Sequence, residues 1–219
     1  GTDDEQHRVF QLPPWFKKLL AEKKLGRKTG GGIFMREKGP RGKRDLVVNP
    51  ATGAYMPRRD GKPSFLSRLR GKPLPQAVNL MYAGKDVSSE IFRRAARALI
   101  AYSFARAPEL SPTGIEGIDL ALKHGFNHAA GPGELVDMLG AERVIRELEK
   151  VASVPPLLAN LYKSDPHRVY TPGVPGARKV YDKAGWREET IPPRALSFAL
   201  LAARQKAELE FPRAGRLFV

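Results

Sequence analysis

The sequence predicts a mainly α-helical protein with small β-hairpins, and three observations lead to this expectation. Apolar residues recur at helical spacing over 15–24 and 88–106, so each of these segments has an apolar stripe. Two other segments, 46–57 and 180–186, combine short apolar runs with turn residues, which is typical of β-hairpins. The chain has 219 residues, enough for one large or two small domains with a real core.

The two main helices have recognisable ends. Prolines stand immediately before the helix at 15–24, where a missing N–H group costs nothing, and Gly26 is its expected C-cap. The helix at 88–106 is expected to start at a capping serine, because serine side chains accept hydrogen bonds from the first turn. Pro108 is expected to end it.

Three shorter helices are expected farther along the chain. The first covers 115–125 and opens with a capping box formed by Thr113 and Glu116. The other two cover 134–139 and 141–151. Residues 58–86 come before all of these helices and are rich in proline, glycine and cations. We therefore expect an extended linker there, with one helical turn near 65–69.

Three short segments occur twice in the same order, which indicates an internal duplication. The matching pairs are "PPWFKKLL" (13–20) with "PPLLANLY" (155–162), Ile33-Phe34 with Val169-Tyr170, and "VVNPATGAY" (47–55) with "VYDKAGW" (180–186). The chain is therefore expected to begin in the closing half of one repeat and to contain a second, fuller copy.

The chain is strongly basic, with 38 Lys and Arg against 23 Asp and Glu, a net charge of +15. Such a charge attracts polyanions: nucleic acid, an anionic membrane, or a phosphorylated ligand such as coenzyme A. The cations are spread along the chain, however, and lack the interleaved aromatic residues of RNA-binding modules. A solvated basic surface is the favoured interpretation, and specific polyanion binding is the alternative.

Several classes of site are not expected. There is no cysteine, so disulfides and thiolate metal sites are excluded and a cytoplasmic location is the default. The four histidines are scattered without the spacing of metal ligands, so no metal site is expected. No apolar run approaches the roughly 20 residues that span a bilayer, and the first ten residues do not resemble a signal peptide.

The stretch "LGRKTGGGIF" (25–34) raises the question of a phosphate-binding glycine loop. Such loops follow a strand and precede a helix, whose N-terminus holds the anion. Here a helix comes first and a strand-like pair follows, so the glycines are expected to provide backbone freedom for a tight turn. Arg27 and Lys28 remain able to contact a phosphate from outside the loop.

Two stretches resemble the helical C-terminal domain of 3-hydroxyacyl-CoA dehydrogenases. "PPWFKKLLAEKKLGRKTGGGIF" (13–34) is similar to the Lys-Thr-Gly-x-Gly-aromatic segment that closes this domain. "GIDLALKHGFNHAAGPGELVDMLGAERV" (117–144) is similar to its second marker. The residues that match the second marker are Asp119, Gly125, Phe126, Gly131, Pro132, Glu134, Leu135, Asp137 and Gly140.

The resemblance implies helical repeats of the 6-phosphogluconate-dehydrogenase C-terminal type, as in long bacterial fusions with an enoyl-CoA hydratase (crotonase) domain. Residues 1–57 would end the first repeat, 58–86 would link the repeats, and 87–190 would form the second. Residues 191–219 would be a connecting helix and strand that lead towards a hydratase domain. Gly133 departs from the pattern, because the family has an aromatic residue there, so looser packing is expected at this corner.

For function, the resemblance implies part of a fatty-acid β-oxidation enzyme that oxidises 3-hydroxyacyl-CoA with NAD. The chain would close the substrate cleft, pack against missing Rossmann and crotonase domains, or form a homodimer. It contains no strand–GxGxxG–helix unit and none of the family's catalytic residues, so no catalytic or NAD-binding residue is assigned and no turnover is expected from the chain alone. Arg27, Lys28 and Arg36 are candidate contacts for coenzyme A.

The motif residues Gly30, Gly32, Phe126, Gly131, Pro132, Glu134 and Asp137 are expected to be structural. Glu134 and Asp137 lie three residues apart on one helix, as an acid–base or metal-binding pair would, but acids near a helix N-terminus are more often caps and dipole partners. Two rival functions stay open: a basic helical module that binds nucleic acid, which is less expected, and a non-catalytic scaffold.

Overall fold

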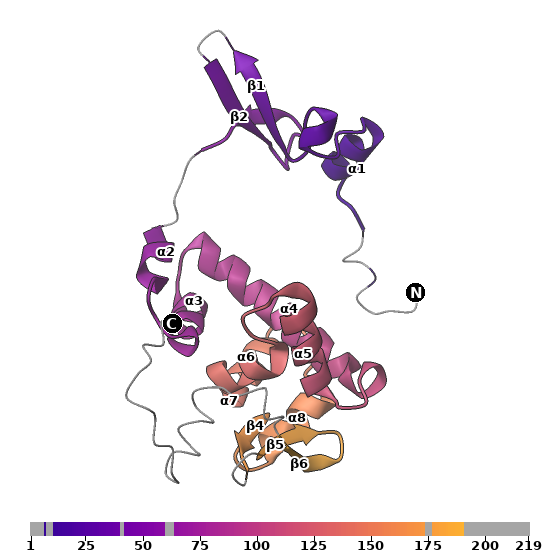
Figure 1. Cartoon of the computed structure of the whole chain (residues 1–219), viewed down its shortest axis with the longest axis vertical. Coiled ribbons are helices and arrows are strands. Elements are labelled where there is room, and N and C mark those ends of the chain that lie inside the picture. The colour runs from indigo at the N-terminus through magenta and orange to yellow at the C-terminus, as the bar shows by residue number, and fades with distance from the viewer. Residues whose placement is uncertain (1–6, 8–10, 40–41, 60–63, 174–176, 191–219) are drawn as a thin grey trace, which may run out of the picture. The chain divides into compact units, whose positions relative to one another are not determined.

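The structure is a computed structural model that describes residue 7 and residues 11–39, 42–59, 64–173 and 177–190 (Figure 1). It divides into two compact units, residues 1–66 and 67–219, and each is described by itself. The described chain is mainly α-helical with two small antiparallel sheets, as the sequence predicts. No described helix is long and apolar enough to cross a membrane. The connecting helix and strand expected at 191–219 lie outside the described residues.

The described part of unit 1 contains the helix α1 and a three-stranded antiparallel sheet with the strand order β1-β2-β3. Its elements are α1 (Pro14–Ala21), a 3₁₀ turn (Arg27–Thr29), β1 (Phe34–Gly39), β2 (Gly42–Val48) and β3 (Tyr55–Pro57). The β2–β3 pair confirms the hairpin predicted at 46–57. The expected C-cap is wrong, because α1 ends at Ala21 and the chain reverses at Lys23, whose φ is 54°. Gly26 instead pairs with Gly31.

Unit 2 contains the remaining helices and a second three-stranded sheet, β4-β5-β6. A short helix, α2 (Ser64–Leu69), crosses the boundary between the units. The elements after it are α3 (Leu74–Ala83), α4 (Val87–Leu110), α5 (Ile115–Phe126), α6 (Pro132–Leu139), α7 (Ala141–Leu148), α8 (Pro156–Lys163), β4 (Tyr170–Pro172), β5 (Ala177–Asp182) and β6 (Gly185–Thr190). The β5–β6 pair confirms the hairpin predicted at 180–186.

Helix α4 is the centre of the unit 2 core (Figure 1). Ile100 and Phe104 lie one turn apart on it and are 0% and 1% exposed. Helices α3, α5, α6, α7 and α8 all pack against α4. Their buried apolar residues, among them Val136, Val144 and Leu158, complete one continuous core, which is the main source of stability for a unit of this size.

The expected linker at 58–86 is only partly correct. A short helix at 64–69 agrees with the helical turn predicted there, but 74–83 is the packed helix α3 rather than extended chain. Val78 and Tyr82, four residues apart, are buried against the unit 2 core, and the Asn79 side chain donates to the Met138 carbonyl at 2.8 Å. The prolines that suggested a linker are tolerated because they stand at the helix start.

Three helix starts differ from the sequence predictions. Asp86, not a serine, caps α4, since its Oδ1 accepts from the Ser89 amide at 3.1 Å. The end of this helix also differs, because α4 continues past Pro108 to Leu110. The predicted Thr113–Glu116 capping box is absent: Gly114 is the N-cap of α5. Helix α6 begins at Pro132, two residues earlier than expected.

The segments that match in the sequence have similar backbone arrangements in the two units. Both α1 and α8 have eight residues and a proline N-cap, and each precedes a three-stranded antiparallel meander. The Val48 amide donates to the Ile33 carbonyl at 3.0 Å, and the Tyr181 amide donates to the Val169 carbonyl at 2.9 Å. The segments matched in the sequence therefore make the same hydrogen bond in each sheet.

Candidate functional site

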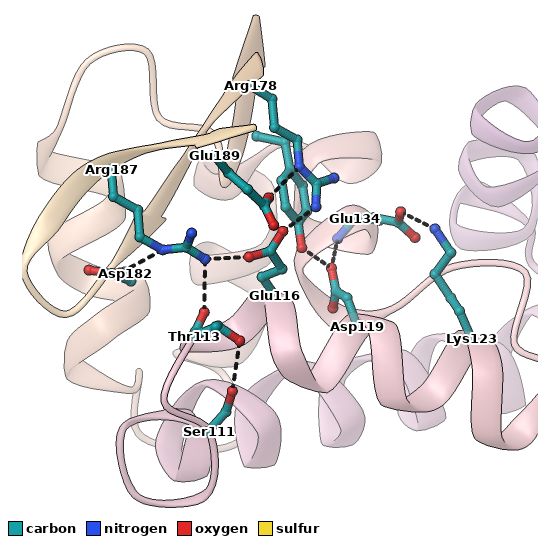
Figure 2. Close-up of polar contacts among 11 residues, drawn as sticks. Ser111, Thr113, Glu116, Asp119, Lys123, Glu134, Arg178, Asp182, Arg187 and Glu189 are labelled. Atoms are coloured by element: carbon teal, nitrogen blue, oxygen red, sulfur yellow. Dashed lines mark hydrogen bonds and ion pairs between the residues drawn. The ribbon is translucent and has the colours of Figure 1, made fainter. Parts of the chain in front are cut away.

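The most extensive polar network of the described chain joins helices α5 and α6 to the sheet of unit 2 (Figure 2). We call it the buried polar cluster. Its members are Glu116, Asp119, Lys123, Glu134, Asp137, Tyr170, Arg178, Asp182, Arg187 and Glu189. Acids at 116 and 119 share one side of α5 because they are three residues apart, and that side faces the sheet.

Glu116 forms one half of the cluster. Its carboxylate is 1% exposed and pairs with both the Arg178 and the Arg187 guanidinium. Arg178 also pairs with Glu189 at 2.9 Å and Arg187 with Asp182 at 3.1 Å, so neither cation depends on Glu116 alone (Figure 2). Burial raises the pKa of Glu116, as does the neighbouring Glu189, while the arginines act in the opposite direction.

Asp119 forms the other half. Its Oδ1 accepts from the Gly133 amide at 2.8 Å, and its Oδ2 accepts from the Glu134 amide at 3.1 Å and the Tyr170 hydroxyl at 2.7 Å. It therefore caps α6 from a different helix. Burial raises the pKa of Asp119 to about 6, although these hydrogen bonds favour the charged form.

Glu134 and Asp137, the pair weighed as acid–base residues, both have structural contacts. Glu134 accepts from the Gly131 amide at 3.1 Å and forms an ion pair with Lys123 at 2.6 Å. Asp137 accepts from the Val169 and Tyr170 amides at 2.7 and 2.9 Å, so it holds the first strand of the sheet against α6. Burial raises the pKa of Asp137, opposed by these amides.

The glycines of the Gly-Pro-Gly segment allow this close packing. A Cβ atom at Gly131 would lie 2.5 Å from the Cα of Asp119, which is backbone and cannot move aside. A Cβ atom at Gly133 would lie 2.8 Å from Asp119 Oδ2 and 3.2 Å from the Val169 side chain. The looser packing expected at Gly133 is therefore wrong. Pro132 is buried as the first residue of α6, whereas Phe126 is 73% exposed and does not join the core.

The chemistry open to this cluster is limited by burial. Glu116 and Asp119 are 1% and 2% exposed, and their oxygens already accept hydrogen bonds from protein groups. A substrate would reach them only if the sheet separated from α5. No group of three acids or histidines in the described residues is arranged to hold a metal ion. The cluster is thus a clamp between sheet and helices.

The glycine triplet of unit 1 has the geometry expected of a turn. The amides of Gly30, Gly31 and Gly32 donate to the carbonyls of Arg27, Gly26 and Phe34 at 3.3, 3.0 and 3.1 Å. Gly30 has a φ of 84°, and a Cβ atom at Gly32 would lie 3.0 Å from the Cα of Gly26. These amides are directed at carbonyls, so they do not form an anion cradle.

Two of the three candidate coenzyme A contacts meet at a surface pocket of about 240 Å³ on unit 1. Arg27 and Arg36 line it together with Arg58, Phe34 and Asp45, whereas Lys28 does not. Arg36 holds Asp45 through two hydrogen bonds of 2.6 and 3.1 Å, and this hydrogen bonding lowers the pKa of Asp45. Arg58 lies over the Phe34 ring at 5.4 Å. Three guanidiniums therefore surround one carboxylate.

The sequence prediction missed the residues contributed by the sheets: Asp45, Arg58, Tyr170, Arg178, Arg187 and Glu189. One signal was present. Val180 and Asp182 of the predicted second hairpin are two residues apart, as are Arg178 and Val180, and this spacing places all three on one side of β5. Their partners on α5 lie more than 60 residues away in sequence and were not predictable from spacing.

Comparison with known proteins gives one relevant similarity. The chain is 24% identical over 153 residues to a protein of Bacillus subtilis (strain 168) named "Probable 3-hydroxyacyl-CoA dehydrogenase". The match covers 69% of this chain but only 19% of that relative. No family model matches the chain. No solved structure matches it.

Proposed function

We propose that this chain is a non-catalytic helical portion of a 3-hydroxyacyl-CoA dehydrogenase, an enzyme that oxidises a 3-hydroxyacyl-CoA with NAD. The similarity to the Bacillus subtilis protein supports this proposal. In such an enzyme the chain would cover the acyl-CoA cleft or supply packing or dimer surface. The unit that begins at Ser67 would be its second helical repeat, of the 6-phosphogluconate-dehydrogenase C-terminal type, and unit 1 the end of the first.

The observation that carries the non-catalytic role is the kind of sheet that the described chain contains. Both sheets are antiparallel meanders, and no parallel strand–helix–strand unit occurs in the described ranges. NAD-binding domains place the dinucleotide at the N-terminus of a helix that follows a parallel strand. In the proposed enzyme, NAD would therefore bind to another part of the parent chain.

Coenzyme A contact is the weaker part of the proposal. Arg36 is held by Asp45, so most of its charge is already compensated. Arg27 and Lys28 lie in the exposed 3₁₀ turn and are the better candidates for the phosphates of coenzyme A. Phosphate groups bind guanidinium and ammonium groups by charge-assisted hydrogen bonds.

The test combines turnover with binding. In an absorbance assay at 340 nm with NADH and acetoacetyl-CoA, the chain is expected to show no consumption of NADH. In calorimetry, acetoacetyl-CoA is expected to bind weakly, and Arg27→Ala/Lys28→Ala is expected to weaken that binding about tenfold. Lys43→Ala, which removes an exposed cation of β2, is the matched control. NADH oxidation in proportion to chain concentration would overturn the non-catalytic role.

The rival function is a basic module that binds nucleic acid, and the net charge of +15 favours it. A rival scaffold without any ligand would show neither acetoacetyl-CoA nor DNA binding. Dimerisation is part of the main proposal, and sedimentation equilibrium would measure it.

A further inference from the structure

Tyr82 of α3 has a buried hydroxyl group without a partner. The residue is 3% exposed, and no described residue makes a hydrogen bond with its Oη atom. Its ring is held in place, because Phe92 of α4 packs on it edge-to-face at 6.5 Å and the Arg143 guanidinium of α7 lies over it at 4.7 Å. A buried polar group of this kind is destabilising unless a water molecule, an ion or a ligand satisfies it.

The Arg97 guanidinium of α4 lies near this hydroxyl and is also poorly satisfied. Its side chain is 14% exposed, and among the described residues its hydrogen-bond partner is Glu147, at a long distance of 3.5 Å. A guanidinium has five N–H donors, so most of those of Arg97 lack a partner in the described chain. Burial raises the pKa of Tyr82, and of the neighbouring charges Arg97, which lowers it, acts most strongly.

The charges at this place do not balance. Arg143 donates to the Asn79 side chain at 3.0 Å and forms no ion pair with a described carboxylate. Glu147, one turn after Arg143 on α7, is shared between Arg97 and Lys150. The hydrogen bond from Lys150 lowers the pKa of Glu147, and the charges of Arg97 and Arg143 act in the same direction. Three cations therefore face one carboxylate.

The unsatisfied groups select a phosphate. Tyr82 stays protonated and is able to donate, and the guanidiniums only donate, so the missing partner is an acceptor. Guanidiniums bind the oxygens of phosphates and carboxylates. A phosphate monoester carries a charge of about −1.5 to −2 at pH 7, which matches the excess of positive charge better than a single carboxylate does. Arg93, also near Tyr82, is already paired with Glu90 at 2.7 Å.

We propose that Tyr82, Arg97 and Arg143 form a binding site for the phosphate group of a small phosphorylated molecule, which takes the place of Glu147 beside Arg97. The Glu147 side chain is 27% exposed, and its second partner, Lys150, is 60% exposed. Glu147 is therefore able to turn outward and keep an ion pair. All of these contacts lie within α3, α4 and α7, and none of them enters the proposed function.

The test titrates the full chain with inorganic phosphate at constant ionic strength, followed by calorimetry and by NMR of isotope-labelled tyrosine. Saturable binding is expected to shift the Tyr82 ring signal, which is assigned from its loss in Tyr82→Phe. This variant removes a hydroxyl without a partner, so its Tm is expected to be unchanged or higher. Its affinity for phosphate is expected to fall about tenfold, because one hydrogen bond to a charged group is lost.

Glu147→Gln is expected to have the opposite effect on binding. It removes the carboxylate that competes for Arg97, so phosphate is expected to bind about tenfold more tightly. The matched control is Arg146→Gln, which removes an exposed cation of the same helix and is expected to leave the affinity unchanged. Arg27→Ala/Lys28→Ala in unit 1 is expected to leave the Tyr82 shift unchanged, which separates this site from the proposed coenzyme A contacts.

The source of the phosphate is identified by competition at the Tyr82 signal. Glycerol phosphate, a simple monoester, is expected to compete with inorganic phosphate. Tighter binding of coenzyme A than of dephospho-coenzyme A, which lacks the monoester, would support the proposal and identify coenzyme A as the source. Absence of a Tyr82 shift overturns the proposal, as does equal phosphate affinity of the original chain and Tyr82→Phe. Binding of a phosphoserine peptide without binding of glycerol phosphate also overturns it.

Discussion

Glu116→Gln tests whether the buried polar cluster holds the unit 2 sheet on its helices. The substitution keeps the shape of the side chain but removes the negative charge between Arg178 and Arg187. Breaking a fully buried ion pair costs about 3–5 kcal/mol. Both arginines are about 30% exposed and keep Glu189 and Asp182 as partners, so we expect a smaller loss of about 2 kcal/mol.

The assay is thermal and urea unfolding followed by circular dichroism. A loss of about 2 kcal/mol corresponds to a decrease in Tm of about 4–8 °C for a unit of this size. The matched control is Glu142→Gln, which breaks the Arg146–Glu142 pair of 2.8 Å on α7, where both side chains are 65% exposed. Exposed pairs of this kind contribute about 0.5 kcal/mol or less. If both variants lose the same stability, Glu116 does not act as a clamp and the reasoning is refuted.

Asp119, Gly131 and Gly125 give three further predictions. The pKa of Asp119 is raised from 3.8 to about 6 in the folded state, so the folded protein binds this proton more tightly than the unfolded chain does. The stability contributed by protonated Asp119 is complete below about pH 4 and is lost as the pH rises through 6, by at most about 3 kcal/mol. Urea midpoints measured from pH 4 to 7 should therefore fall more steeply for the original chain than for Asp119→Asn. Parallel profiles of the two proteins would contradict this prediction. Gly131→Ala is expected to cost about 3 kcal/mol or more, because the new Cβ meets the Asp119 backbone at 2.5 Å; an unchanged Tm would show that the contact relaxes. Gly125 lies in the last turn of α5, and a Cβ atom there would have nothing within 4 Å. Gly125→Ala is therefore expected to stabilise the protein by about 0.5–1 kcal/mol in the same measurement. A loss of stability in this variant would mean that the helix end depends on glycine.

Local patterns predicted much of the fold. The apolar stripe of α4 and the two hairpins are carried by residues close together in sequence, where period and turn chemistry decide the structure. Helix α3 was missed because Pro73 and Pro75 were interpreted as breakers, although proline is favoured at a helix start. The spacing of Val78 and Tyr82, one turn apart, was the available signal.

The site was less predictable because its decisive contacts are distant in sequence. Thr113 and Glu116 have the spacing of a capping box, a local pattern, but Glu116 pairs with Arg178 and Arg187, 62 and 71 residues away. The energy of two ion pairs exceeds that of one cap, so tertiary contacts override the local preference. Asp119 and Asp137 belong to the stretch that carries the resemblance, but their partner Tyr170 is 51 and 33 residues away in sequence.

The most direct test of the proposed function compares two titrations of the full chain, one with acetoacetyl-CoA and one with a DNA duplex, at 50 and 200 mM salt. A portion of a 3-hydroxyacyl-CoA dehydrogenase is expected to bind acetoacetyl-CoA saturably, more tightly than ADP, and to bind DNA only weakly. Saturable DNA binding whose affinity falls about a thousandfold between the two salt concentrations, without any acetoacetyl-CoA binding, would contradict the proposal.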